Sequence, residues 1–276
     1  MEIHDSAYKQ FASGLGTEGL RREFLVSGLF YRGEAHFRYW ETDRTVVGGI
    51  CPGTAAMALP NSAGLRSAHF LERREAGIVN IGGPGLVRAE GAEYRLGNLD
   101  ALYLGRGSDG VSFASASESE PAQFWLLSYP AHAKHPSRHV AFLEANGEKL
   151  GSGDGANERT LYKLIHAGAF PTCQIVMGVT RLAPGSVWNT MPPHTHLRRS
   201  EVYLYFGLQP GSAVFHLMGT PAETRHLVVR QAEAVLSPPW SIHSGVGTGN
   251  YSFVWGMGGE NQEFADMDRT DIDKLL

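Results

Sequence analysis

Two histidines separated by one residue and followed by a glutamate constrain the fold of this chain more than any other feature. They are His194, His196 and Glu201, and a third histidine, His243, lies downstream. In an extended strand, residues two apart point to the same side, so His194 and His196 present their imidazoles together. Glu201 stands at an odd offset and would face away if the strand were continuous. The strand must therefore be interrupted between His196 and Glu201.

The residues between them are suited to that interruption. Residues 197–200 are largely polar and predict a turn. The run from Glu201 to Phe206 is rich in aromatic and branched residues and predicts a strand. Glu201, Tyr203 and Tyr205 would then share one face of this strand.

Three imidazoles and one carboxylate form the donor set of a metal site. Neutral imidazole is the commonest metal ligand in proteins, and burying such polar groups without a partner costs several kcal/mol. We therefore predict a metal ion held by His194, His196, Glu201 and His243. The set suits zinc, iron, nickel, manganese or copper, and the sequence does not choose among these metals.

Short apolar runs separated by glycine and proline predict an all-β protein. The chain of 276 residues contains 34 glycines and 14 prolines, and typical runs are residues 45–50, 78–81 and 101–104. Helical patterns occur mainly near the ends, for example after the cap-like residues Ser6 and Thr17. The length allows one large or two modest domains.

The two halves of the chain share landmarks in the same order. The corresponding segments are 51–54 and 183–186, 69–75 and 196–201, 100–105 and 233–238, and 111–113 and 251–253. We interpret them as a duplicated β domain, with domains at 1–150 and 151–276 and a linker-like composition at 151–156. Ser67 stands where the second half has His194, and residues 105–108 offer no imidazole in place of His243. The first half is therefore expected to be a degenerate domain without a metal site.

Charge and composition exclude several classes of partner. The net charge of −4 gives no basic footprint for nucleic acid. No apolar run reaches transmembrane length, and the first residues do not form a secretory leader. Two cysteines, Cys51 and Cys173, do not make a disulfide framework. We expect a cytoplasmic protein that binds neither nucleic acid nor membranes.

The motif and several longer segments resemble known proteins. The spacing His194-x-His196-x4-Glu201 with a distant His243 is similar to the metal motif of the cupin superfamily, although Gly185 lies farther from His194 than is usual there. Pro-Trp-Ser at 239–241 also replaces the customary Pro-x-Gly. Segments 72–83, 188–196, 241–248 and 255–262 extend the likeness through nearly the whole chain. Together they resemble the 4-deoxy-L-threo-5-hexosulose-uronate ketol-isomerase (5-keto-4-deoxyuronate isomerase) family.

This resemblance implies a fold, a cofactor and a reaction. The implied fold is a bicupin, a duplicated double-stranded β-helix with two tandem antiparallel barrels, an N-terminal helical extension and a short C-terminal helix. The implied cofactor is one Zn²⁺ per chain on His194, His196, Glu201 and His243, in a homo-oligomer that is typically a hexamer. The implied reaction of pectin breakdown interconverts 5-dehydro-4-deoxy-D-glucuronate and 3-deoxy-D-glycero-2,5-hexodiulosonate, which is an aldose–ketose isomerisation of a small-molecule substrate.

Such a reaction moves a proton between two carbons and needs a base as well as a partner for the substrate carboxylate. The candidates for proton transfer are Glu201, Tyr203 and Tyr205, among which the sequence does not choose. Cationic side chains suit the carboxylate, and tryptophans near the motifs can wall a sugar pocket. The candidates for these contacts are Arg181, Arg198, Arg199, Arg225, Lys163, Trp188 and Trp240.

Two other functions stay open. An iron-dependent cupin dioxygenase would depend strictly on O₂ and ferrous iron. A non-enzymatic sugar-binding bicupin would bind metal or sugar without turnover.

Overall fold

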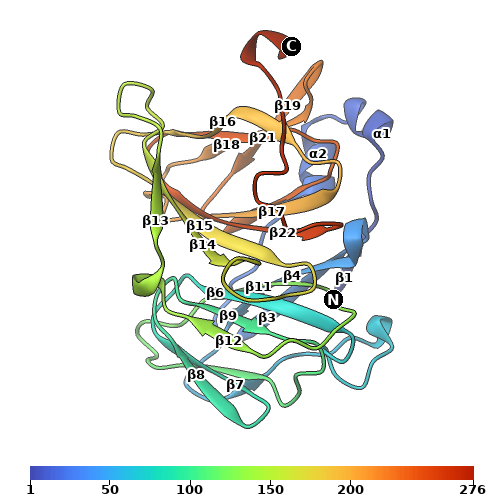
Figure 1. Ribbon diagram of the computed structural model, residues 1–276, viewed down its shortest axis with the longest axis vertical. Coiled ribbons are helices and arrows are strands. Elements are labelled where there is room, and N and C mark those ends of the chain that lie inside the picture. The colour runs from blue at the N-terminus through green and yellow to red at the C-terminus, as the bar shows by residue number, and fades with distance from the viewer. The chain divides into compact units, whose positions relative to one another are not determined.

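The computed structural model describes residues 1–276, which form 23 β-strands and two α-helices (Figure 1). The predicted predominance of β structure is confirmed. The chain divides into two compact units, each made of several segments. The first comprises Met1–His4, Gly28–Ala145 and Leu164–Met177, and the second comprises Asp5–Ser27, Asn146–Lys163 and Gly178–Leu276.

The first unit contains a seven-stranded sheet and a four-stranded sheet. In spatial order, the larger sheet consists of β1 (Glu2–His4), β3 (Glu34–Trp40), β4 (Thr45–Cys51), β11 (Phe124–Pro130), β6 (Arg74–Asn80), β9 (Ala101–Leu104) and β12 (Arg138–Val140). The smaller sheet consists of β5 (Met57–Ala58), β10 (Ser112–Ser115), β7 (Gly85–Ala89) and β8 (Ala92–Leu96). Apolar side chains from both sheets form one buried core, which includes Val46, Ile78, Leu102, Phe113 and Phe124.

The second unit is built largely from a seven-stranded sheet and a five-stranded sheet, which lie as two layers in Figure 1. The larger sheet consists of β13 (Gly147–Leu150), β14 (Arg159–Ile165), β15 (Val176–Leu182), β22 (Ser252–Gly259), β17 (Arg199–Phe206), β20 (Glu233–Ser237) and β2 (Leu25–Val26). The smaller sheet consists of β19 (Glu223–Val229), β18 (Val214–Thr220), β21 (His243–Gly247), β16 (Trp188–Thr195) and β23 (Asp268–Arg269). Residues 151–156 connect β13 to β14, which pair antiparallel.

The two units share an order of connections. The larger sheets run β3-β4-β11-β6-β9 in the first unit and β14-β15-β22-β17-β20 in the second. The smaller sheets run β5-β10-β7-β8 and β16-β21-β18-β19. This agreement supports a duplication. It also shows that one pair of segments matched in the sequence, 111–113 and 251–253, does not correspond in the structure. Residues 111–113 lead into β10, whose counterpart is β21, whereas residues 251–253 lead into β22, the counterpart of β11.

The match of Glu75 with Glu201 in the sequence repeat is wrong by one residue. Ala76 lies opposite Leu104 in the first unit, and Glu201 lies opposite Ser237 in the second. Because Leu104 and Ser237 correspond in the sequence repeat, Glu201 corresponds to Ala76 and not to Glu75. Side chains alternate along a strand, so Glu75 faces the other side of its sheet. Its buried carboxylate there accepts hydrogen bonds from three successive backbone N–H groups of a neighbouring loop.

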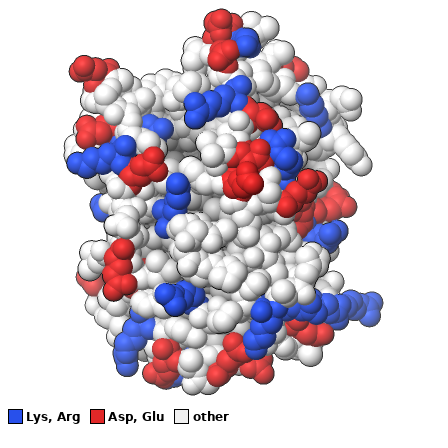
Figure 2. Space-filling model, viewed as in Figure 1, with Lys and Arg blue, Asp and Glu red and all other residues white.

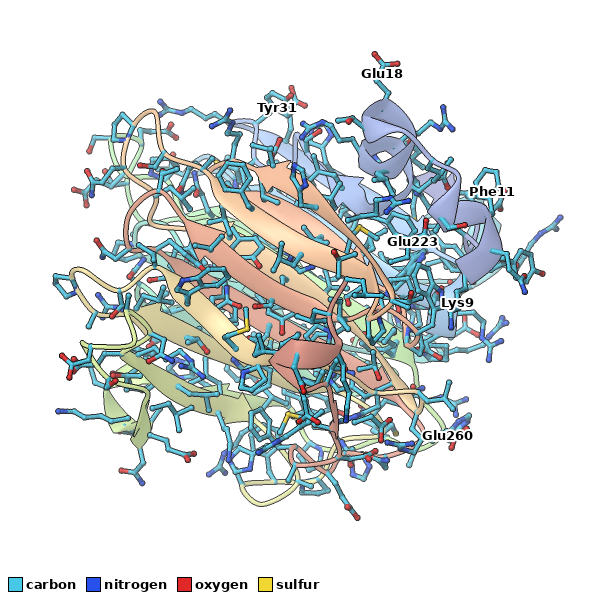
Figure 3. All side chains as sticks on the ribbon, turned by 90° about the horizontal axis from the view of Figure 1, so that it is seen from above. Lys9, Phe11, Glu18, Tyr31, Glu223 and Glu260 are labelled. Carbon is cyan, nitrogen blue, oxygen red and sulfur yellow. The ribbon has the colours of Figure 1, made fainter.

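The predicted N-terminal helices are present as α1 (Lys9–Ser13) and α2 (Thr17–Phe24), but their N-cap residues are Tyr8 and Gly16 instead of Ser6 and Thr17. They pack on the second unit, where Arg21 Nη1 donates to the carbonyl of Val228 at 2.7 Å. Figure 3 shows Glu18 on the outer side of these helices. The expected C-terminal helix is a single 3₁₀ turn, too short to count as an α-helix. The four 3₁₀ turns are Thr42–Arg44, Ala63–Leu65, Phe142–Glu144 and Ile272–Lys274.

Candidate metal centre

The four predicted ligands converge from three strands of the second unit. His194 lies near the end of β16 and pairs directly with His243 at the start of β21. His196 follows β16, and a turn closed by the Arg199 N–H and the His196 carbonyl at 3.1 Å leads into β17. The interruption predicted from the parity of Glu201 is confirmed. Strand β17 begins at Arg199, two residues earlier than predicted.

The ligand atoms lie close enough to share one ion. One donor atom from each of the four residues lies within 4.8 Å of all the others. The Nε2 atoms of His194 and His243 are 2.9 Å apart. Glu201 Oε2 lies 3.2 Å from His243 Nε2 and 3.3 Å from His196 Nε2. All four side chains are buried, with exposed fractions between 1% for His243 and 8% for His194.

The protonation and bonding of this cluster fit a cation. Burial lowers the pKa of His194 to about 3, and the neighbouring His196 and Arg199 act in the same direction. Burial also holds the pKa of the His243 imidazole well below its ordinary value, so both rings stay neutral with a lone pair available. Glu201 Oε2 is buried without a hydrogen-bond partner, which is costly unless a cation lies beside it. The four residues could therefore hold a metal ion.

The hydrogen bond at the far side of one ring orients it for this role. His243 Nδ1 lies 3.2 Å from the hydroxyl of Ser237 on β20. Ser237 is the residue opposite Glu201 in the β17–β20 pair. Outer hydrogen bonds of this kind fix the tautomer and orientation of a metal-binding imidazole. The contact leaves His243 Nε2 directed at the other ligands.

A cavity of about 470 Å³ opens onto the cluster and belongs entirely to the second unit. Its lining residues are Glu148, Leu150, Arg159, Leu161, Lys163, Thr180, Thr190, Met191, Pro192, His194, His196, Glu201, Tyr203, Phe253, Trp255, Met257, Phe264, Ala265, Met267 and Arg269. Gly178 makes room for one wall, because a Cβ atom there would approach the Trp255 ring to 2.3 Å. The Trp255 indole donates a hydrogen bond to Thr180 at 3.2 Å.

The two candidate tyrosines occupy different surroundings. Tyr203 lines the cavity together with Glu201 and Thr190. Tyr205 does not line the cavity, and its hydroxyl lies 2.8 Å from Nδ1 of the buried His216. Burial raises the pKa of each phenol well above its ordinary value. Both hydroxyls therefore stay protonated at neutral pH.

Among the predicted contacts to the substrate, Lys163 alone lines this cavity. Arg198 and Arg199 are held elsewhere by Asp266. Arg198 makes a two-pronged ion pair with its carboxylate at 2.6 and 2.7 Å, and the buried Arg199 donates to its carbonyl at 2.8 Å. Arg181 is exposed on β15.

The remaining three candidates also lie away from the cavity lining. Arg225 and Trp240 line a separate space of about 160 Å³ beside α1. Figure 3 shows Glu223, which pairs with Arg225 at 2.6 Å, on the side of the unit that carries Lys9. Trp188 is half-buried on β16, opposite Val246.

Two cationic residues of the cavity were missed in the sequence. Arg159 and Arg269 both line it. A signal for Arg159 was present, since Arg159, Leu161 and Lys163 are spaced by two and all three line the cavity. Arg269 carried no such signal, because its position depends on the pairing of β23 with β16, where it lies opposite His194.

The C-terminal segment 261–269 forms a strap along the cavity. It supplies Phe264, Met267 and Arg269 to the lining. The ion pair of Asp266 with Arg198 fastens it to the turn before β17. Arg198 also reaches Asp268 at 3.0 Å, so the strap is fixed at two points.

Loss of this fastening should loosen the strap and leave the metal ligands in place. We expect Asp266→Ala to raise KM several-fold and to accelerate amide hydrogen exchange in residues 261–269, with bound metal unchanged. Hydrogen-exchange mass spectrometry and elemental analysis measure the two effects. Asp271→Ala, which removes the exposed pair with Lys274, is the matched control. Unchanged exchange in Asp266→Ala would show that the strap is held by other contacts.

Comparison with known proteins identifies the family. Residues 27–275 match the KduI/IolB family. The chain belongs to this family. It is 49% identical, over the full length of both chains, to the 4-deoxy-L-threo-5-hexosulose-uronate ketol-isomerase of Yersinia pseudotuberculosis serotype O:1b (strain IP 31758). The same identity holds for the protein of that name from Yersinia pestis (strain Pestoides F). The resemblance stated from the sequence is confirmed.

Solved structures extend the comparison to the fold. An IolB-like protein from Salmonella typhimurium LT2 superimposes with a TM-score of 0.74 at 14% identity, covering 90% of this chain and 96% of that one. At this identity the relationship to that structure is a likeness of fold. No helix of the protein is both long enough and apolar enough to cross a membrane. On the face drawn in Figure 2, cationic and anionic side chains are interspersed.

Proposed function

We propose that the protein is a metal-dependent ketol-isomerase that interconverts 5-dehydro-4-deoxy-D-glucuronate and 3-deoxy-D-glycero-2,5-hexodiulosonate in the breakdown of pectin-derived uronates. The observation that carries the proposal is the full-length identity of 49% to isomerases of this name. The buried His and Glu cluster supports it, since it lies at a cavity of about 470 Å³. That volume falls in the range of small-molecule sites.

The proposed cofactor is one Zn²⁺ per chain, held by His194, His196, Glu201 and His243. Bound there, a divalent cation would act as a Lewis acid toward the adjacent carbonyl and hydroxyl oxygens of the substrate. Zinc is the choice implied by the family resemblance, and the three-nitrogen, one-oxygen donor set also accommodates other first-row metals.

The residues around the cluster can handle the proton that moves between C2 and C1. We place this role on Glu201 and Tyr203, because both line the cavity from one face of β17. The Tyr203 hydroxyl holds its proton and can donate it, whereas the Glu201 carboxylate would accept one with the oxygen that a carboxylate shift leaves free of the metal. Tyr205 would act on this pair through packing, since its ring stacks on Tyr203 with centroids 6.1 Å apart.

We further propose the assembly implied by the family. Each unit's two sheets would form a double-stranded β-helix barrel, so that the chain is a bicupin that arose from modules 1–150 and 151–276. The repeated order of strands supports this ancestry, with segments Asp5–Ser27 and Leu164–Met177 each packing on the other module's unit. The proposed form in the cell is a cytoplasmic homohexamer.

The test is turnover of the unsaturated uronate that a pectate lyase releases from oligogalacturonate. We expect NMR to show the carbonyl moving from C1 to C2 without added nicotinamide, flavin or oxygen. In D₂O, a side-chain base that exchanges with solvent places deuterium on the carbon that was C1 of the substrate, which is C6 in the numbering of the product. An unlabelled product would show that the migrating hydrogen does not exchange with solvent, and it would rule out Glu201 and Tyr203 as a base that exchanges.

Two conditions separate the alternatives. A dioxygenase would stop under strict exclusion of oxygen, whereas the isomerase keeps its full rate. Chelation should abolish turnover and added zinc should restore it. Full activity in protein verified to be metal-free would contradict the metal-dependent mechanism. Binding of the sugar without any turnover would leave a binding protein as the remaining function.

A further inference from the structure

Three cationic side chains line the cavity beside the metal cluster. Lys163 is paired with a carboxylate, and Arg269 lies opposite a predicted metal ligand. Lys163 Nζ lies 3.7 Å from the carboxylate of Glu148 and 4.4 Å from the centroid of the Phe264 ring. Arg269 is exposed on the strap, opposite His194 in the β16–β23 pair. The third is Arg159.

Arg159 differs from Lys163 in lacking an anionic partner, and from Arg269 in being partly buried. It is only partly exposed, at the start of β14, and no carboxylate lies within ion-pair distance of its guanidinium. One of its nitrogens, Nη1, donates to the carbonyl of Asn157 at 2.9 Å. A guanidinium carries five N–H donors, so most of the donors of Arg159 are available to a ligand in the cavity it lines.

The surroundings of Arg159 make an anion there favourable. Burial lowers the pKa of its guanidinium from the ordinary value, although the group remains charged at neutral pH. A charge removed from water without a counter-charge is costly, and a bound carboxylate would offset that cost. Arg159 also lies within electrostatic range of Tyr203, which lines the same cavity. Glu201, Tyr203 and Arg159 all line the same cavity.

We propose that Arg159 binds the carboxylate of the substrate and selects uronates over neutral sugars. The proposal rests on the uronate substrate proposed above. The sequence predicts other cationic residues for the contact with the substrate carboxylate. In a substrate whose reacting carbons lie beside Glu201 and Tyr203, the carboxylate at the other end of the chain would meet Arg159, which lines the same cavity from β14. A planar guanidinium can hold both carboxylate oxygens at once, which an ammonium cannot.

The experiment compares wild type with Arg159→Gln, Arg159→Lys and Arg181→Gln. Arg181→Gln is the matched control, because it removes the same charge from an exposed position outside the cavity lining. Turnover of 5-dehydro-4-deoxy-D-glucuronate is measured together with metal content. Calorimetric binding of D-galacturonate and of D-galactose is measured on the same metal-loaded proteins, since this pair differs only in the carboxylate.

We expect Arg159→Gln to lower kcat/KM by about 10- to 100-fold, mostly through KM, because a hydrogen-bonded charge is lost. Galacturonate binding should weaken in parallel, with galactose binding and metal content unchanged. Arg159→Lys should recover part of the loss, and Arg181→Gln should match wild type.

The outcomes separate this inference from the proposed function. Suppose that wild type does not turn over the uronate but binds galacturonate, and that Arg159→Gln loses this binding. The isomerase assignment then fails, and the role of Arg159 stands. If Arg159→Gln binds galacturonate as wild type does, or weakens galactose equally, the role of Arg159 is overturned. The same holds if wild type shows no preference for galacturonate over galactose.

Discussion

Alanine in place of His196 is expected to remove the metal from the protein and to abolish turnover. His196 is 2% exposed and its Nε2 atom lies 3.3 Å from Glu201 Oε2, so no water-exposed group can take its place without rearrangement. Loss of an outer-shell partner already weakens metal affinity about 10- to 100-fold, and loss of a direct ligand should exceed that. Elemental analysis after dialysis against zinc should find far less than one equivalent per chain.

Thermal unfolding provides an independent readout of the same change. A ligand present at 1,000 times its dissociation constant stabilises the folded state by about 4 kcal/mol. Wild type should therefore lose several degrees of Tm when a chelator is added, and His196→Ala should respond little. A His196→Ala protein that retains one equivalent of metal with unchanged affinity would rule out this ligand set.

His69 provides the control within the same chain. In the sequence repeat it corresponds to His196, but it lies in the first unit, which is predicted to lack a metal site. His69→Ala should leave metal content near one equivalent per chain. A halving of the bound metal would show that both units carry a site.

The metal cluster could be predicted because its geometry is largely local. The alternation of a strand places His194 and His196 together, and the odd offset of Glu201 demands the turn that the structure contains. Glu75 shows where motif alignment fails. The pairing of Ala76 with Leu104 and of Glu201 with Ser237 shows that Glu75 points to the opposite face of its sheet from the one that Glu201 uses. Parity is reliable within a strand and fails when two strands are aligned by motif alone.

The substrate contacts depend on pairings that are distant in sequence. Arg198 stands within the metal motif, but its partner Asp266 is 68 residues away, and that ion pair directs it to the strap. Arg159 lies 35 residues before His194 and reaches the same cavity only because β14 and β16 contribute to one unit. Proximity to a motif therefore predicted which side chains cluster, but it did not predict the cavity walls.

Replacement of Glu201 by glutamine should change the stability of the metal-free and metal-loaded protein in opposite directions. Glutamine keeps the shape of the side chain and an oxygen that can accept from Tyr203, but it removes the negative charge. Without metal, Glu201 Oε2 is a buried acceptor with no hydrogen-bond partner, and such a group costs about 1–3 kcal/mol. Metal-free Glu201→Gln should thus unfold a few degrees above metal-free wild type.

With zinc the order should reverse. Glu201 is the one anionic ligand of the set, so glutamine weakens the attraction for a divalent cation and the stabilisation that binding brings. Calorimetric unfolding with chelator and with excess zinc measures both states. Glu148→Gln is the control, because Glu148 lines the same cavity but lies outside the ligand set. It should not shift the unfolding temperatures of the metal-free and metal-loaded protein in opposite directions. If metal-free Glu201→Gln unfolds below wild type, the carboxylate is satisfied by its protein neighbours, and the orphaned oxygen no longer argues for a cation at this centre.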